Sequence, residues 1–281
     1  MRQRLISSIV MVPIVVGVFL LGMPWLALGV GLLSIVAATE AFRLLAAAGF
    51  PVQRLPGVIA PPLAVAGMAW AAAPAGAAAA LVAGVLIVAA IDAFRRPDVR
   101  DGFMAWVGTS FGAIYASLLA FVIGIVTVAP ALPADAPLHG LFDAGRTWLL
   151  VLVLTVWSFD TFAYLSGRTF KKGRFLNHIS PNKTWSGVIG GTVAAIVVAT
   201  VLTWATGQSP VAGAVLGLLI AVTAQSGDVA ESMLKRAAGQ KDSGTLIPGH
   251  GGILDRTDSF LFAAPALFAF LVALEPLGLL R

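Results

Sequence analysis

The sequence predicts an all-α, polytopic integral membrane protein with about nine transmembrane helices. Of its 281 residues, 59% are hydrophobic and only 11% are charged, whereas a soluble domain usually carries about 25% charged residues. Long apolar runs also recur along the whole chain. Within a bilayer, helices satisfy their own backbone hydrogen bonds segment by segment, so we expect these runs to be helical. The absence of cysteine excludes disulfides, thiolate metal sites and a cysteine nucleophile.

Each apolar run has roughly the 17–26 residues that a helix needs to cross a hydrocarbon core of about 30 Å. We expect spans at residues 5–23, 25–46, 56–73, 75–93, 103–128, 147–166, 185–205, 210–227 and 259–279. No small-residue cleavage site follows the first run, so it is expected to be a retained helix rather than a signal peptide. Prolines at 61, 62 and 74 interrupt the Ala-rich region, and we expect a turn at Pro74–Gly76.

Basic residues indicate the orientation. With nine spans, all of the 18 Lys and Arg residues except Arg146 and Arg281 lie on the side of the N-terminus. The positive-inside rule therefore places the N-terminus in the cytosol and the C-terminus outside. The net charge of +5 reflects this topology, and no nucleic-acid partner is expected. We expect a multi-pass protein of a bacterial-type inner (plasma) membrane, with an active site that faces the cytosol.

The two halves of the chain differ in polarity. Residues 1–145 are mostly apolar helices with short loops, and we expect them to form a scaffold and to contribute any dimer contacts. Residues 146–281 hold the two long polar loops, 167–184 and 228–258, and are expected to be catalytic. In the first half, Glu40 and Arg43 are three residues apart on a helix, which favours a local ion pair.

Acidic residues concentrate around the end of the eighth span and the start of the ninth. These are Asp228, Glu231, Asp242, Asp255 and Asp258. Asp255 and Asp258 would share one helical face, and carboxylate oxygens suit Mg²⁺, which also binds substrate phosphates. The alternative is a set of solvated loop acids paired with Lys235, Arg236 and Arg256. The residues alone leave both interpretations open.

Two further segments carry residues suited to phosphate binding. Pro248–Gly252 is a flexible turn whose glycines would let backbone N–H groups approach an anion, although an ordinary tight turn explains glycines equally well. His250 could donate to a phosphate or hold the loop. The second segment, Ser180–Gly187, opens the seventh span, where a helix N-terminus favours anions and Lys183 adds charge. It is not a P-loop, because Asn182 replaces the glycine that precedes the lysine.

The segment from Ser232 to Asp258 resembles the signature of the phosphatidate cytidylyltransferases, also called CDP-diacylglycerol synthases. The matching residues are Ser232, Leu234, Lys235, Arg236, Lys241, Asp242, Gly244, Pro248, His250, Gly251, Gly252, Asp255, Arg256 and Asp258. The Asp160, Tyr164 and Gly167 positions and the Ser180–Trp185 element are also similar to that family. Ser186 departs from it, since many members have glutamate there, and the role of that acid is open in this chain.

The resemblance implies that CMP is transferred from CTP to phosphatidic acid, giving CDP-diacylglycerol and pyrophosphate in phospholipid biosynthesis. It implies Mg²⁺ at Asp228, Asp255 and Asp258, with a second, monovalent cation left open, and a homodimer. We expect Lys235 and Arg256 to act with these acids in catalysis. The residues expected to bind substrate phosphates are Ser180, Asn182, Lys183, Thr184, Arg236, Lys241, His250, Gly251 and Gly252.

Two other functions fit parts of the sequence. A CTP-dependent lipid kinase of the polyprenol type would share nucleotide chemistry at a membrane, but it would transfer the γ-phosphoryl group. The His250–Asp258 arrangement favours the cytidylyltransferase. A transporter would place ionisable residues near the bilayer centre and show internal symmetry. The charges here concentrate on one face of the membrane, which favours chemistry at the surface.

Overall fold

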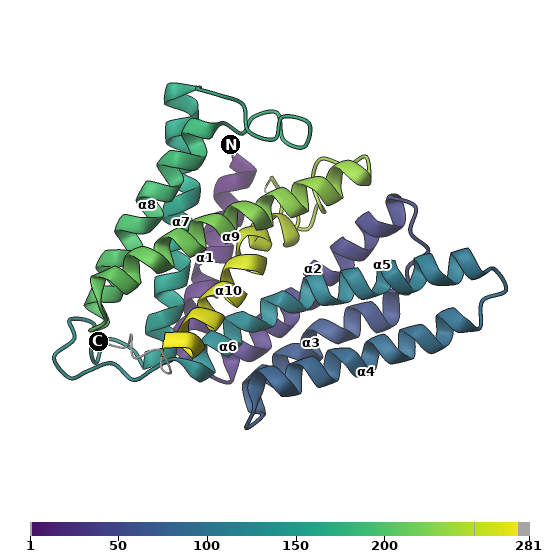
Figure 1. The fold of residues 1–281 in the computed structure, drawn as a ribbon, viewed down its shortest axis with the longest axis horizontal. Helices are drawn as coiled ribbons and strands as arrows, with labels where there is room; N and C mark the ends of the chain where they lie inside the picture. Colours follow the sequence, from purple (N-terminus) through teal and green to yellow (C-terminus); the bar gives the residue numbers. More distant parts are fainter. Residues whose placement is uncertain (1, 250, 275–281) are drawn as a thin grey trace. The chain divides into compact units, whose positions relative to one another are not determined.

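The computed structural model describes residues 2–249 and 251–274, and a helix lies at each of the nine predicted apolar segments (Figure 1). The helices are α1 (Arg2–Leu21), α2 (Trp25–Ala47), α3 (Arg54–Trp70), α4 (Pro74–Phe94), α5 (Val99–Ser117), η1 (Leu118–Ala120), α6 (Phe121–Val128), α7 (Ala144–Phe170), α8 (Trp185–Ala205), α9 (Pro210–Ala237) and α10 (Leu254–Leu274). The fifth predicted span is one apolar stretch interrupted by a single 3-10 turn, η1. The end of the predicted span 259–279 lies outside the described residues.

Seven apolar stretches among the described residues are long enough to cross a membrane. They are α2, α4, the continuous Val99–Val128 stretch, α7, α8, α9 and Leu254–Ala273 of α10. α3 has 17 residues and the described apolar part of α1 runs from Ile9 to Leu21, so both are shorter. The chain is therefore an all-helical, multi-pass membrane protein, while the count of nine spans and the orientation stay predictions.

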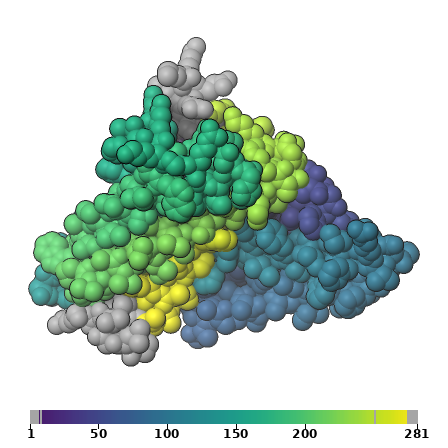
Figure 2. Space-filling model, turned by 45° about the horizontal axis from the view of Figure 1, so that its top comes forward, coloured from purple at the N-terminus to yellow at the C-terminus, as the bar shows by residue number. Residues whose placement is uncertain are grey.

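Apolar side chains cover the outer faces of these helices. Helices α4 and α5 lie side by side and together form a broad surface, blue in Figure 2. Ile87 and Val88 on α4 and Phe103 on α5 are each about 60% exposed. Such residues would be costly against water but are stable against lipid. The buried side chains are instead mostly alanine and larger aliphatic residues, together with the rings of Phe42 and Trp148.

Two predicted boundaries were wrong at the ends of helices that carry charge. The eighth span was predicted to end at residue 227, but α9 continues to Ala237 and includes Asp228, Lys235 and Arg236. The last helix begins at Leu254, not 259, so Asp255 lies in its first turn. The residues of α9 after 227 include Glu, Met, Leu, Lys and Arg, which are all strong helix formers. Their polarity therefore marks where the chain reaches the membrane surface, while the helix itself continues. The irregular loop is thus only residues 238–253.

Prolines also mark different positions from those expected. α3 continues through Pro61 and Pro62, which a helix in a membrane can accommodate when neighbouring groups satisfy the freed backbone carbonyls. Pro74 does not form the turn that the sequence suggested, because it lies in the first turn of α4. Proline is favoured there because its missing N–H would have no helical partner. The turn lies just before it, at residues 71–73.

Side-chain caps begin three of the helices. Asp98 accepts from the backbone N–H of Asp101 at the start of α5, and Thr184 accepts from Gly187 at the start of α8. Asp143 accepts from the N–H of Arg146 at the start of α7. Partial burial would raise the pKa of Asp143, but the backbone and side-chain hydrogen bonds from Arg146 outweigh it and hold that pKa below its usual range.

The chain divides into two compact units. The first comprises Met1–Gly124 and Met233–Thr257, and the second comprises Ile125–Ser232 and the chain from Asp258 onward. The polar loop 238–253 therefore belongs to the same unit as helices α1 to α5. This division differs from the predicted boundary between residues 145 and 146, which concerns function and stays a prediction.

Within the first unit, helices α2, α3 and α5 pack around Phe42. The ring of Phe42 is fully buried, and it occupies the space that a side chain at Gly57 on α3 or Gly112 on α5 would need. α3 and α4 approach still more closely, since a Cβ at Gly67 would lie 2.6 Å from the backbone nitrogen of Ala78. Small residues that let backbones approach are the usual way in which helices associate in membranes.

Within the second unit, α7, α8 and α9 pack by the same means. A Cβ at Gly187 or Gly191 of α8 would lie 2.8 Å from a backbone carbonyl oxygen of α7. A Cβ at Gly217 of α9 would lie 2.5 Å from the Cα atom of Ile196 on α8. The α7–α8 contact fixes the ends of both helices, and the basic loop 171–184 connects those ends.

Candidate functional site

Asp255 is the centre of a hydrogen-bonded cluster in the first unit, which we call the Asp255 cluster: Glu40, Lys235, Ser243, Gly252 and Asp255. Its Oδ1 accepts from Lys235 Nζ at 2.7 Å. Its Oδ2 accepts from the N–H of Ser243 at 2.9 Å, the hydroxyl of Ser243 at 2.9 Å and the N–H of Gly252 at 2.8 Å. The side chain is only 6% exposed. Asp255 therefore ties the end of α9 and the loop to the first turn of α10.

Glu40, in the last third of α2, is the second carboxylate of the cluster. Its Oε2 accepts from Leu254 N–H at 2.8 Å and from the Ser243 hydroxyl at 3.1 Å. Its Oε1 accepts from Ile253 N–H at 3.2 Å. The side chain thus points at the loop and not toward Arg43, which is exposed, so the expected local ion pair was wrong. The hydroxyl of Ser243 lies between the two carboxylates.

Glycines let the loop close around these two carboxylates. Gly251 has φ +85°, a conformation that side chains disfavour, and a Cβ there would lie 2.6 Å from Asp255 Oδ2. A Cβ at Gly252 would overlap Ser243 Oγ and Glu40, and a Cβ at Gly244 would overlap Glu40. Close packing against acids therefore accounts for three glycines of the motif. Phosphate binding by Gly251 and Gly252 stays a prediction.

Lys183 and Asp228 form the central contact of the second unit's polar region. Lys183 Nζ lies 2.7 Å from Asp228 Oδ2, and the two side chains are 16% and 38% exposed. Asp228 Oδ1 has a longer contact of 3.4 Å from the hydroxyl of Ser232. The structure thus joins two separately predicted motifs, the basic element before α8 and the acids of α9. It pairs the lysine that we expected on phosphate with a carboxylate that we expected on metal.

The loop 171–184 is fixed to the start of α8 by backbone contacts. The N–H of Phe175 donates to Lys183 O at 2.9 Å, and the N–H of Trp185 donates to Gly173 O at 3.0 Å. Thr184 caps α8 by accepting from Gly187 N–H at 3.1 Å. At the position where many relatives of the motif have glutamate, the Ser186 hydroxyl accepts from Lys172 N–H at 3.3 Å. Thr184 is therefore a cap here, and its contact with phosphate stays a prediction.

The other expected site residues have simpler surroundings. Arg236 donates to Gln240 O at 3.0 Å, while Lys241, Arg256 and Asn182 are exposed. Ser180 is half-buried, and its backbone N–H donates to Leu176 O at 3.0 Å. Asp258 Oδ1 accepts from Ser259 N–H at 2.7 Å. His250 lies outside the described residues.

The expected magnesium site can be compared with the carboxylates present. Across residues 2–249 and 251–274, no three His, Asp or Glu side chains lie close enough together to hold a metal ion. Asp255 already accepts four hydrogen bonds and is almost fully buried. Among the described residues, Asp228 has one close partner, Lys183, and a longer contact with Ser232, and it is accessible. By donor chemistry Asp228 suits a hard cation that also keeps water ligands, whereas the Asp255 oxygens are occupied by protein donors.

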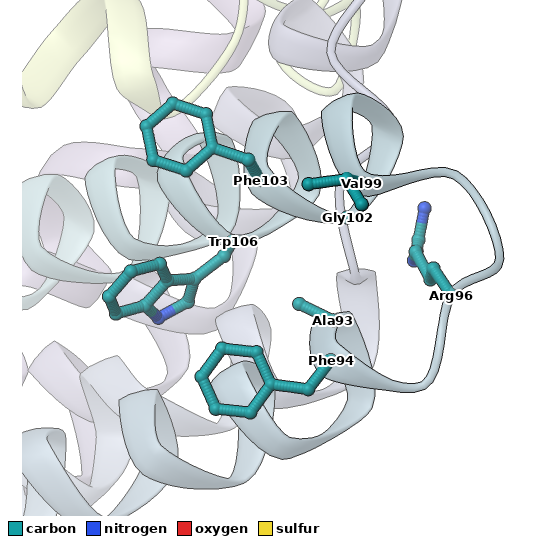
Figure 3. A pocket seen from close by; sticks show the side chains of 7 residues that line it. All are labelled: Ala93, Phe94, Arg96, Val99, Gly102, Phe103 and Trp106. Carbon is teal, nitrogen blue, oxygen red and sulfur yellow. The ribbon is translucent and has the colours of Figure 1, made fainter.

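A separate pocket of about 320 Å³ lies between the end of α4 and the start of α5 (Figure 3). It is lined by Ala93, Phe94, Arg96, Val99, Gly102, Phe103 and Trp106. The rings of Phe94 and Trp106 meet edge to face at 6.3 Å, and Arg96 is paired with Asp101 at 2.6 Å. Aromatic rings with an arginine at the end of two spans are typical of a membrane–water interface, and none of these residues was expected in the site.

Comparison with known proteins supplies the family. The model of the cytidylyltransferase family matches residues 2–274, almost the whole chain. The chain belongs to the cytidylyltransferase family. It is 47% identical over 136 residues to a phosphatidate cytidylyltransferase of Synechocystis, covering 46% of each chain. It is 40% identical over 158 residues to one of Haemophilus influenzae, covering 54% of this chain and 53% of that protein.

The matched portions of these relatives are partial. The chain spans about half the length of the first two curated relatives that it matches. The match to the phosphatidate cytidylyltransferase of Rickettsia felis, 34% identical over 167 residues, covers 56% of this chain and 73% of that protein. The family match therefore extends over nearly the whole chain, whereas the similarity to proteins named phosphatidate cytidylyltransferase covers about half of it.

Sequence reasoning missed two members of the Asp255 cluster, Glu40 and Ser243. A signal for Glu40 was present, because an acid within an apolar span needs a partner and often marks a function. Its partners are more than 200 positions away in the sequence, whereas the expected partner Arg43 was only three residues away. Ser243 lacked a signal, since a loop serine is common and its two acceptors become visible only in the folded chain.

Proposed function

We propose that this chain is a phosphatidate cytidylyltransferase, which transfers CMP from CTP to phosphatidic acid and releases pyrophosphate. The observation that carries the proposal is its similarity, at 34–47% identity, to relatives that bear this name. Membership of the cytidylyltransferase family and the seven candidate membrane spans support a reaction between a soluble nucleotide and a membrane lipid.

In the proposed reaction, an oxygen of the lipid phosphate attacks the α-phosphorus of CTP. A new oxygen–phosphorus bond forms, the bond from the α-phosphorus to the bridging oxygen breaks, and pyrophosphate leaves. The attacking phosphate is already anionic near neutral pH, so no protein nucleophile is needed. The principal barrier is the approach of two anions, which positively charged groups lower by stabilising charge in the transition state.

The chain's cations would meet the triphosphate and the lipid phosphate. Lys241 and Arg256 are exposed and suited to a nucleotide that arrives from solution. Lys183 lies within 2.7 Å of Asp228, so its positive charge is held at the start of α8 before substrate binds. Lys235 is enclosed to a similar degree, with a side chain that is 13% exposed, but it donates to Asp255, which is itself only 6% exposed. Its proposed role is to hold the Asp255 carboxylate and with it the loop.

The proposed reaction uses Mg²⁺, which would neutralise negative charge on the phosphates. Asp228 is the most suitable donor, because its carboxylate is accessible and retains an oxygen with only a long protein contact. Asp258, half-buried in the same unit, is the second proposed donor. Asp255 completes the acids that the motif implies, but its present hydrogen bonds favour a role in holding the loop.

The proposed cellular setting is supported by the charge distribution. We place the chain in a bacterial-type inner membrane with its polar loops on the cytosolic side, where CTP is made. The excess of Lys and Arg on the N-terminal side supports this orientation. A homodimer is the proposed assembly. Its subunit stoichiometry in detergent can be measured by light scattering.

The test is transfer of label from CTP to lipid. Purified protein in detergent–phosphatidate micelles is incubated with α-labelled CTP and Mg²⁺. Label in the lipid phase, with equimolar pyrophosphate and loss of both on addition of EDTA, is the expected result. Transfer of γ-label to a polyprenol with release of CDP would establish the lipid kinase instead. Folded protein with neither activity would contradict the proposal.

A further inference from the structure

Glu40 connects the apolar N-terminal helices directly to the polar motif loop. It lies on α2 and is only 2% exposed, yet its three hydrogen-bond donors lie 203 to 214 residues further along the chain. All of them belong to the same compact unit. These hydrogen bonds fix Ser243, Ile253 and Leu254. The chain between them contains the glycine turn, Pro248–Gly252, and leads into Asp255.

The contacts of Glu40 match what the start of a helix requires. The first N–H groups of a helix have no partner within it, and negative charge is favourable beside them. Glu40 accepts from two of these groups, Ile253 N–H and Leu254 N–H, at the start of α10. The next one, Asp255 N–H, donates to the hydroxyl oxygen of Ser243 at 3.3 Å. Asp255 itself accepts from Gly252 N–H, two residues before the helix. Two carboxylates from distant parts of the sequence therefore hold the start of one helix.

Ser243 couples the two carboxylates. Its hydroxyl lies 3.1 Å from Glu40 Oε2 and 2.9 Å from Asp255 Oδ2. A hydroxyl has a single hydrogen to donate, so its sharing depends on the position of both acids. Gly244 and Gly252 have no room for a Cβ beside Glu40. A shift of Glu40 would thus move Ser243, and Ser243 would move Asp255 and its partner Lys235.

We propose that Glu40 is a positioning residue for the cytidylyl-transfer site: it acts through Ser243 and the α10 N-terminus to hold Asp255, Lys235 and the glycine turn in their working geometry. This inference rests on the proposed function. Glu40 itself does not contact substrate. The N-terminal helices then do more than form a scaffold, because α2 supplies one of the two acids that organise the motif loop.

The experiment compares three variants by steady-state transfer of α-labelled CTP and by hydrogen–deuterium exchange. In Glu40→Ala, Ile253 N–H and Leu254 N–H lose their acceptor, and the Ser243 hydroxyl keeps only Asp255 Oδ2. We expect kcat to fall about 10–100-fold, as for other residues that orient a site, with a much smaller change in the KM for CTP. Peptides covering 243–255 should exchange faster, while peptides of α3 and α4 stay at the wild-type rate. Thr39→Ala, which removes a hydroxyl bonded only within α2, is the matched control and should retain activity.

Two milder variants cover the case in which Glu40→Ala does not fold. Glu40→Gln keeps one oxygen for Leu254 N–H but turns an NH₂ group toward another donor, and it should give an intermediate kcat. Ser243→Ala removes the link between the carboxylates together with the acceptor of Asp255 N–H, and its effect should not add fully to that of Glu40→Gln. Faster exchange at 243–255 with wild-type kcat would reduce Glu40 to a structural role, and unchanged exchange would show that it does not hold the loop. Absence of transfer in wild-type protein would instead reject the proposed function.

Discussion

Replacing Asp255 by asparagine tests the most connected side chain of the candidate site. Asparagine has the same shape but offers only one acceptor atom, and its NH₂ group is a donor. Asp255 Oδ2 accepts from three donors and Oδ1 from the ammonium of Lys235. In either orientation of the amide, the NH₂ group therefore faces a donor. The variant also removes the carboxylate to which Lys235, 13% exposed, donates.

The cost follows from burial of the pair. Removing one member of a buried ion pair typically destabilises a protein by about 3–5 kcal/mol. Asparagine retains some of the hydrogen bonds, so the lower end, about 3 kcal/mol, is expected. For a chain of this size that corresponds to a fall in Tm of about 6–12 °C. Turnover should also be lost, because Lys235, Ser243 and the glycine turn are no longer held together.

Two measurements check this expectation. Thermal unfolding in detergent, followed by tryptophan fluorescence, gives the change in stability, and transfer of α-labelled CTP gives the activity. The double variant Lys235→Met, Asp255→Asn should recover part of the lost stability, with a coupling of about 0.5–3 kcal/mol, but no activity. If Asp255→Asn keeps the wild-type Tm and loses activity to an extent that depends on the Mg²⁺ concentration, a structural role is refuted and Asp255 is a metal ligand.

Three further predictions concern residues outside that pair. Lys183→Met should change stability by at most about 1 kcal/mol, because its partner Asp228 is accessible to solvent. It should raise the KM for CTP about 10–100-fold, because a charge-assisted hydrogen bond to the substrate is lost. An unchanged KM in the transfer assay would remove Lys183 from the phosphate site. Asp228→Asn should raise the Mg²⁺ concentration for half-maximal activity about tenfold or more, as measured by Mg²⁺ titration, and an unaltered titration would exclude it as a donor. Gly251→Ala should lower the Tm by several degrees more than Gly239→Ala, since both residues have positive φ but only Gly251 has an atom, Asp255 Oδ2, within reach of the new Cβ; equal losses would show that the contact is unimportant.

The fold was predictable to a large extent because a membrane imposes strong local rules. As far as the structure describes the chain, helical structure lies at every predicted apolar segment. The errors lie at positions where local chemistry was ambiguous. Charged residues of α9 were assigned to a loop although they favour helix, and Pro74 was assigned to a turn although it suits the first turn of α4. In both cases a polar or helix-breaking residue marked a position near a helix end without fixing where the end lies.

The candidate site was predictable as a set of residues but not as a set of contacts. The motif residues Lys235, Asp255 and Gly252 do meet in one cluster. Their partners Glu40 and Ser243 were not expected. Asp228 was expected with Asp255 on a metal, which stays a prediction, and its contact with Lys183 was not expected. Sequence spacing orders residues along one helix, whereas each of these pairs joins segments that are distant in the sequence.

The sequence by itself determined the solvent of this protein, its helical class and the residues that carry its chemistry. Hydrophobic length, charge content and motif identity are properties of single segments, and the bilayer acts on each segment separately. Only the tertiary structure decided which acid is accessible and which is enclosed. Asp228 and Asp255 are the same residue type, but one lies beside a single lysine and the other is enclosed by Lys235, Ser243 and Gly252. That difference arises because the loop folds back on α2 and α10, and such packing depends on contacts that no single segment contains.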